Sequence, residues 1–228
     1  MKGAIIPLVL IALVVIAGYA SADINQSSSG NYNVKIYLQK GWNLVYGIPN
    51  IQDDYPLESG STLAKGDIKA VYWYNPIDNK YAQTYPPQFK GFPELRDKYA
   101  YISGSASWVY SENAGYLAYS SIDPIKLQDK KLIQGWNFVG ISPEFKMKKL
   151  SQIKGTCTFD RFAIWKNNEQ KYTVFSSGDK INVEGNSLNL EDVIPADSDS
   201  DLGNGFLIKT TGDCQLGSGS FSPPTIPG

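Results

Sequence analysis

The sequence predicts an all-β protein, and its composition, its turn residues and an internal repeat all favour this fold class. The 228 residues include 15 Tyr, 5 Trp, 21 Gly and 13 Pro. Aromatic residues favour twisted strands, and Gly and Pro favour the tight turns that join strands. No long stretch of the sequence has the 3.6-residue hydrophobic period of an amphipathic helix. We therefore expect short strands arranged as small β-sandwiches or barrels.

The first 22 residues have the layout of an export signal. A positively charged start at Lys2 precedes an apolar run over 4–20, and Ala20-Ser21-Ala22 fits the small-x-small cleavage pattern. We expect a secretory signal peptide at 1–22 and a flexible linker at 23–31. Two alternatives stay open. One is an uncleaved membrane anchor, and the other is an N-terminus that resembles archaeal type IV pilin-like proteins, which are cut after a glycine such as Gly3 and keep the apolar helix for filament assembly. All three place the rest of the chain outside the cytoplasm.

An internal repeat follows the linker. Gly41-Trp42-Asn43 recurs as Gly135-Trp136-Asn137, Trp73-Tyr74-Asn75 with Lys80-Tyr81 recurs as Trp165-Lys166-Asn167 with Lys171-Tyr172, and Gly115-Tyr116-Leu117-Ala118 matches Gly205-Phe206-Leu207-Ile208. Three matching blocks in the same order predict an internal duplication. The expected tandem domains are 32–123 and 124–217, followed by a tail rich in Gly, Ser and Pro at 218–228.

Each domain is expected to hold several short strands. In the first domain, residues 34–39 alternate apolar and polar side chains before the Gly-Trp-Asn turn, and further strands are expected at 44–48, 68–74 and 116–120. In the second domain, the expected strands are 131–134, 138–141, 161–165, 172–175 and Gly205–Thr210, with one helical turn near Leu150–Ile153.

The Gly-Trp-Asn motif has a physical role in both copies. We expect its glycine to adopt a positive φ, its Trp to cover the end of the core, and its Asn to bond main-chain groups in the turn. Stacking of Trp42 and Trp136 against a ligand is the alternative.

The repeated blocks resemble a domain common in secreted and cell-surface proteins of bacteria and archaea. Its pattern is a strand, Gly-Trp-Asn, an aromatic strand with a Tyr-bearing hairpin, and a closing Gly-aromatic strand. The first domain departs from this pattern through the extra run Ser107-Trp108-Val109-Tyr110. The resemblance implies surface-layer, adhesive or accessory modules without catalytic activity.

Export makes the two cysteines informative. In an oxidising compartment two thiols are usually paired, so Cys157 and Cys214 are expected to form a disulfide. The alternative is two separately buried free cysteines. Asn25-Gln26-Ser27 is an N-glycosylation sequon, which makes Asn25 a candidate modification site.

Aromatic side chains are the candidate binding residues. The first domain is rich in aromatic residues, namely Tyr72, Trp73, Tyr74, Tyr81, Tyr85 and Trp108, and exposed rings are common docking sites for sugar or protein partners. Trp73, Tyr81, Tyr85 and Trp108 are the expected binding residues. Because successive strand residues face opposite ways, Tyr72 and Tyr74 lie opposite Trp73, so at most one set faces solvent. A plain aromatic core is the alternative.

One acidic loop is a candidate calcium site, and calcium is the only cofactor that we expect to be possible. Asp197, Asp199 and Asp201 alternate as oxygen ligands of calcium often do. The loop departs from the calcium-binding pattern because Leu202 replaces the turn glycine and Ile208 replaces the bidentate glutamate. A solvated acidic loop is the alternative.

Composition excludes several classes of function. The chain has no His, so Ser-His-Asp and Cys-His catalysis are impossible, and a net charge of −1 argues against nucleic-acid partners. Candidate acids such as Glu94, Asp97, Asp160 and Glu191 form no recurring constellation, so we expect no enzyme.

We predict a non-catalytic extracellular or cell-surface protein with a structural or adhesive role, whose partner is a surface protein, a glycan or another copy of this chain. A filament subunit that keeps its N-terminal helix and a carbohydrate-binding module are the alternatives. Contact with a membrane is expected only through an uncleaved N-terminal segment.

Overall fold

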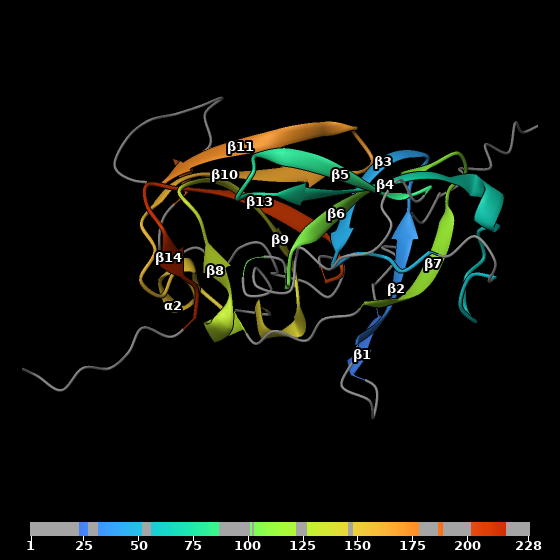
Figure 1. Ribbon diagram of the computed structural model, residues 1–228, viewed down its shortest axis with the longest axis horizontal. Coiled ribbons are helices and arrows are strands. Elements are labelled where there is room, and N and C mark those ends of the chain that lie inside the picture. The colour runs from blue at the N-terminus through green and yellow to red at the C-terminus, as the bar shows by residue number, and fades with distance from the viewer. Residues whose placement is uncertain are drawn as a thin grey trace, which may run out of the picture.

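The computed structural model describes residues 23–26, 32–51, 56–86, 101, 103–121, 127–145, 148–177, 187–188 and 202–217. Strands dominate this part of the chain and form four sheets (Figure 1), so the all-β prediction is confirmed. None of the helices in these ranges is long and apolar enough to cross a membrane. The predicted signal at 1–22, the tail at 218–228 and the acidic loop with Asp197, Asp199 and Asp201 lie outside the described residues. Asn25 lies in a described strand, β1 (Asp23–Gln26).

The first half of the molecule comprises β1 to β7. Strand β2 (Tyr32–Leu38) pairs with β1 and with β7 (Gly115–Ser121). A four-stranded sheet has the order β3-β6-β4-β5. Its strands are β3 (Gly41–Tyr46), β6 (Ala106–Ser111), β4 (Ile68–Asn75) and β5 (Lys80–Tyr85), and the short helix η1 (Lys65–Asp67) precedes β4.

The second half comprises β8 to β14 and repeats this strand order. Strand β8 (Lys131–Leu132) pairs with β14 (Cys214–Gln215), and the larger sheet has the order β12-β11-β10-β13-β9. Its strands are β9 (Gly135–Gly140), β13 (Gly205–Thr210), β10 (Phe159–Lys166), β11 (Lys171–Ser177) and β12 (Ser187–Leu188). The helices η3 (Leu127–Asp129), η4 (Pro143–Phe145) and α2 (Leu150–Ile153) complete this half. In Figure 1 the β2–β7 and β8–β14 pairs lie at opposite sides, with the two larger sheets between them.

Strand pairing aligns the two larger sheets residue by residue. Gly41 lies opposite Ser111 in β6, and Gly135 lies opposite Thr210 in β13. A β-bulge interrupts the next ladder at the same place, between Ile68 and Ala70 in one half and between Phe159 and Arg161 in the other. Strand β13 therefore occupies the position of β6. The sequence match of residues 205–208 with 115–118 was wrong, because residues 115–118 lie in β7, beside β2.

The hairpin turns correct a second match. Asn79 and Gln170 both have a φ of 52°, and each immediately precedes the second strand of its hairpin. This alignment places Trp165 at the position of Tyr74 rather than Trp73. A shift of one residue moves a side chain to the opposite face of a strand, so the two tryptophans point to different surroundings.

The Gly-Trp-Asn motif makes the same corner twice. Gly41 and Gly135 have φ values of 103° and 104°, where a side chain is disfavoured. The Asn43 Nδ2 donates to the carbonyl oxygens of Gln39 and Gly41 at 2.8 and 3.0 Å. Asn137 repeats these bonds with the carbonyl oxygens of Ile133 and Gly135 at 2.7 and 3.0 Å. Both side-chain amides are buried, and each stabilises the turn in which the chain passes from one sheet to the next.

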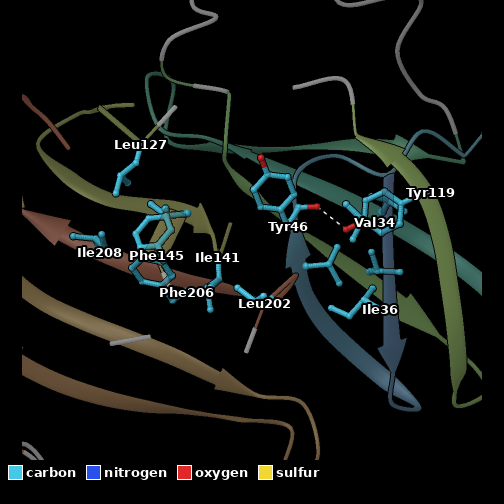
Figure 2. Close-up of a cluster of buried hydrophobic side chains, with 14 of the residues drawn as sticks. Val34, Ile36, Tyr46, Tyr119, Leu127, Ile141, Phe145, Leu202, Phe206 and Ile208 are labelled. Atoms are coloured by element: carbon cyan, nitrogen blue, oxygen red, sulfur yellow. Dashed lines mark hydrogen bonds between the residues drawn. The ribbon is translucent and has the colours of Figure 1, made fainter. Parts of the chain in front are cut away.

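One continuous buried core contains side chains from both halves. In Figure 2, Tyr46 and Tyr119 lie on one side of the core and Phe145 and Phe206 on the other. The Tyr119 hydroxyl donates to the Tyr46 carbonyl at 2.6 Å, and burial raises the pKa of this phenol well above its ordinary value. The predicted disulfide between Cys157 and Cys214 is confirmed, and it links the segment before β10 to β14.

Candidate functional site

The candidate site lies where the two halves of the molecule meet, and main-chain hydrogen bonds join the halves there. The Tyr46 N–H donates to the Gly203 carbonyl at 2.7 Å, and the Gly140 N–H donates to the Gly104 carbonyl at 2.9 Å. Tyr46 and Gly140 end β3 and β9, and each acceptor glycine lies just before β13 or β6. Each half thus donates an equivalent main-chain hydrogen bond to the other half. Reciprocal contacts of this kind are typical of a two-fold, isologous interface.

The larger sheets face each other across a second, smaller core. Its buried side chains come equally from the two halves: Leu44, Ala106 and Trp108 from the first, and Phe138, Ala163 and Leu207 from the second. A Cβ atom on Gly205 would lie only 2.4 Å from the Ala106 Cβ, so this glycine is required by the close approach of the sheets. The faces are in direct contact at their centre.

Beside this core, six aromatic side chains line an open groove of about 390 Å³. Four rings come from the first half and two from the second: Trp42, Tyr72, Tyr81 and Trp108, and Trp165 and Tyr172. Trp108 is the central ring, with its centroid 5.0 Å from that of Trp165 and 6.1 Å from that of Tyr172, both edge to face. The groove therefore straddles the contact between the halves.

Two tyrosines form the exposed part of the groove. Tyr81 is 53% exposed and Tyr172 is 37% exposed, whereas Trp108 is only 9% exposed. Both tyrosines follow the hairpin turns directly, at equivalent positions of β5 and β11. A ligand would therefore meet these two rings first and Trp108 at the base.

The lining of the groove is uncharged. Burial raises the pKa of Tyr81 and of Tyr172, and for Tyr172 the neighbouring Tyr81 adds to the rise. Both phenols are therefore neutral across the physiological pH range. The Tyr72 hydroxyl donates to the Gln83 Oε1 at 3.0 Å. The polar groups of the lining are thus tyrosine hydroxyls and tryptophan indole N–H groups, all of them uncharged.

Gln170 holds one wall of the groove in place. Its Oε1 accepts from the Trp42 N–H at 2.8 Å, and its Nε2 donates to the Trp42 carbonyl at 2.9 Å. The Trp165 Nε1 donates to the same carbonyl at 2.9 Å. The turn of the second half is thereby attached to the first strand of the larger sheet in the first half, and Trp42 is positioned through its main chain.

The structure brings together only part of the predicted aromatic set. Tyr81 and Trp108 line the groove. Trp73 and Tyr85 are buried, at 1% and 8% exposure, so the prediction that they form a binding face with Tyr81 and Trp108 is corrected. Trp73 lies on the opposite side of β4 from Tyr72, and a register shift beside Val71 places Tyr85 opposite that buried residue. Both side chains therefore face the interior.

Sequence reasoning missed four of the lining rings as a group. Trp165 and Tyr172 were noted only as repeat residues and Trp42 chiefly as a structural residue, whereas Tyr72 was considered in the aromatic set but not chosen as a binding residue. The available signal was alternation, because Tyr72 must share a side with Trp108 once Trp73 is placed in the core.

The candidate acids and metal ligands give no second site in the described ranges. No group of three or more Asp, Glu, Cys or His side chains is placed there to hold a metal ion. The Asp160 carboxylate pairs with the Lys209 Nζ at 2.8 Å. Glu94, Asp97 and Glu191 lie outside those ranges.

Comparisons with protein-family models, with curated proteins and with solved structures found no match to this chain.

Proposed function

We propose that this chain is a non-catalytic extracellular binding protein with an adhesive or structural role, and that the aromatic groove is its contact surface. The observation that carries the proposal is the groove itself, where six rings line an open space of about 390 Å³. Ligand pockets are typically lined by aromatic side chains, and Trp and Tyr dominate the energy of many binding sites.

A binding role fits the chemistry of the lining better than catalysis does. A general acid or base needs a pKa near the working pH, whereas burial moves the phenols of Tyr81 and Tyr172 further from neutrality. The Gln83 amide does not titrate. These groups can position a ligand by packing and hydrogen bonding, but they do not transfer protons near neutral pH.

The extracellular placement is supported by the disulfide. Cys157 and Cys214 are joined across a separation of 57 residues, and disulfides persist mainly in oxidising compartments. Retention of residues 4–20 for filament assembly is a separate proposal. Sequencing the N-terminus of the protein taken from its source cells separates the two routes: a start at Asp23 contradicts the filament, and a start at Ala4 contradicts simple secretion.

We also infer that the two halves arose by duplication. The common strand order, the aligned β-bulges and the matching turns at Asn79 and Gln170 support this inference. So does a matched cap, in which the Ala64 N–H donates to the Asp67 Oδ2 before β4, and the Lys149 N–H donates to the Gln152 Oε1 before β10.

The binding proposal is tested by retention on the envelope of the source cells. The labelled full chain is mixed with an envelope fraction, and the bound fraction is compared for wild type and for Tyr81→Ala/Tyr172→Ala. These are the exposed rings of the groove, and neither is a buried residue of the small core. We expect the double variant to lose most of its binding.

A matched control removes two tyrosines elsewhere. Tyr37 and Tyr116 form an edge-to-face pair on β2 and β7, with centroids 5.2 Å apart and outside the groove. Tyr37→Ala/Tyr116→Ala is expected to bind like wild type. Equal binding by all three proteins would contradict a role for the groove.

A further inference from the structure

The chemical class of the ligand follows from what the groove offers, and this step rests on the proposed binding function. All six lining residues are Trp or Tyr, and none carries a charge. An ionised ligand group moved from water into such a site finds no counter-charge for its lost hydration. The lining therefore favours an uncharged ligand with apolar surface.

Equivalent positions of the two halves carry side chains of different size. Tyr72 and Trp108 face the second sheet from β4 and β6, and strand pairing makes Ala163 and Leu207 their counterparts in β10 and β13. Ala163 and Leu207 are both buried in the small core. Trp108 belongs to the same core, and Tyr72 packs against it, but both rings also line the groove, which Ala163 and Leu207 do not. The larger rings of the first half therefore offer a ligand a surface that their counterparts do not.

The polar groups at the groove are suited to hydroxyl partners. The Tyr81 and Tyr172 hydroxyls at the exposed part of the lining are neutral. Each of these groups both donates and accepts hydrogen bonds without charge. Binding sites of this kind combine a mainly apolar lining with a few such groups that orient the ligand.

A cationic ligand is the main rival, because aromatic rings attract ammonium groups. Glu169, the carboxylate of the adjoining turn, already pairs with Lys171 at 2.8 Å and with Lys166 at 3.2 Å. It is therefore committed to two cations. The rings come from six strands, β3, β4, β5, β6, β10 and β11, and they line an open groove, whereas a single ammonium group is held by a compact aromatic cage.

We propose that the groove binds a neutral carbohydrate chain. The apolar faces of its sugar rings pack against Trp108, Tyr81 and Tyr172, and its hydroxyls hydrogen-bond to groups at the rim. Sugars suit this surface because they present C–H groups on their ring faces and uncharged hydroxyls at their edges. Contact with two exposed tyrosines favours an oligosaccharide over a monosaccharide.

The test uses the full chain and follows tryptophan fluorescence, because three of the six lining residues report on occupancy. The probes are neutral oligosaccharides, acidic oligosaccharides, tetramethylammonium and a peptide with the uncharged, proline-rich sequence of residues 218–228. We expect saturable binding of at least one neutral oligosaccharide, and no comparable binding of the other three probes.

Two variants give the first half the smaller side chains that the second half has at the equivalent positions. Tyr72→Ala and Trp108→Leu introduce the residues found at the equivalent positions, which the second half accommodates in its own buried face. Each is expected to weaken binding of the neutral oligosaccharide at least about tenfold, while Tyr37→Ala leaves it unchanged. Circular dichroism confirms that the variants are folded, and Tyr172→Ala at an exposed site provides a second, independent loss of affinity.

The outcomes separate the ligand class from the binding function. If no neutral oligosaccharide binds, or if tetramethylammonium or the peptide binds in preference, the carbohydrate proposal is overturned. Envelope binding that still depends on Tyr81 and Tyr172 would then leave the binding function intact. Neutral oligosaccharide binding that Tyr72→Ala, Trp108→Leu and Tyr172→Ala do not weaken would place the sugar outside the groove.

Discussion

The two halves close their folds by different means. In the first half, β2 pairs with β7 over seven residue pairs, from Tyr32 opposite Ser121 to Leu38 opposite Gly115. In the second half, β8 pairs with β14 over only two, Cys214 with Leu132 and Gln215 with Lys131. The disulfide between Cys157 and Cys214 lies at this short pair. A covalent cross-link thus stands where the other half has a long hydrogen-bonded ladder.

The halves also differ at the groove. Gln170 reaches across to Trp42, and its Oε1 lies 2.5 Å from the position of a Cβ atom on Gly41. Nothing lies within 4 Å of the same position on Gly135. The equivalent turn residue of the first half, Asn79, instead accepts a hydrogen bond from the Tyr74 hydroxyl. One copy of the shared corner has therefore become part of the groove wall, and the other has not.

The largest effect is expected from removing the disulfide. Cys157→Ala/Cys214→Ala removes the cross-link of a 57-residue loop, which in the chain-entropy model lowers the free energy of unfolding by about 4 kcal/mol. The β8–β14 ladder is short, and the hydrogen bonds that join Gln215 to Thr156 lie directly beside the disulfide. Urea denaturation measures the loss, and hydrogen exchange locates it. Amides of β8 and β14 should lose protection while those of β2 and β7 keep theirs. Equal loss in both pairs would contradict the comparison.

We expect Asn43→Ala and Asn137→Ala, in the two copies of the Gly-Trp-Asn turn, to lower the free energy of unfolding equally. Asn43→Ala removes two bonds to carbonyl oxygens and the bond from the Gln39 N–H to the Asn43 Oδ1 at 2.8 Å. Asn137→Ala removes the same set, with the Ile133 N–H at 3.0 Å. Because buried main-chain groups would lose their partners, each variant should lower the free energy of unfolding by about 1–3 kcal/mol. A difference of more than about 1 kcal/mol between them would mean that the corners are not equivalent in energy.

Much of the fold could be predicted from local signals. Strand alternation, turn residues and cysteine pairing are properties of short segments or of composition, and they led to the all-β class and to the disulfide. The strand β6 was missed because its run Ser107-Trp108-Val109-Tyr110 was interpreted as a departure from the repeat pattern. Strand pairing shows that this run occupies the position of residues 206–209 in β13.

The side of a strand on which a residue lies depends on details that sequence does not reveal. The β-bulge between Ile68 and Ala70 has no distinct sequence signal, and matching Trp73 with Trp165 required a shift of one residue from the true alignment. The groove was hidden for a different reason. Its wall depends on contacts between distant residues, such as the bond from the Trp165 Nε1 to the Trp42 carbonyl across 123 positions. Such contacts appear only when the halves are packed together.

Substitution of Gly41 and Gly135, the glycines of the two Gly-Trp-Asn turns, is expected to change stability less. Gly41→Ala and Gly135→Ala both force a side chain into a φ near 104°, which should cost about 1–2 kcal/mol in each half. The added methyl at Gly41 also collides with the Gln170 side chain, whereas the methyl at Gly135 meets open space. Only Gly41→Ala should change the tryptophan fluorescence of the folded protein. Thermal unfolding and emission spectra of the two variants provide the measurement, and identical spectra would contradict a role of the Gln170 contact in positioning Trp42.

The smallest expected loss of stability comes from exchanging the two turn residues. Gln170→Asn shortens the amide by one methylene and withdraws it from the Trp42 main chain, while Asn79→Gln lengthens the amide that has no such target. These bonds are near the surface, so the free energy of unfolding should fall by less than about 1.5 kcal/mol in Gln170→Asn and hardly change in Asn79→Gln.

Hydrogen exchange of the Trp42 amide tests the same contact more directly, because the Gln170 side chain accepts a hydrogen bond from this N–H in the native protein. We expect the exchange rate to rise in Gln170→Asn alone, with the Trp136 amide as the internal control because β9 occupies the same edge of its sheet as β3. An unchanged rate at Trp42 would mean that the strand, and not the turn of the other half, positions this wall of the groove.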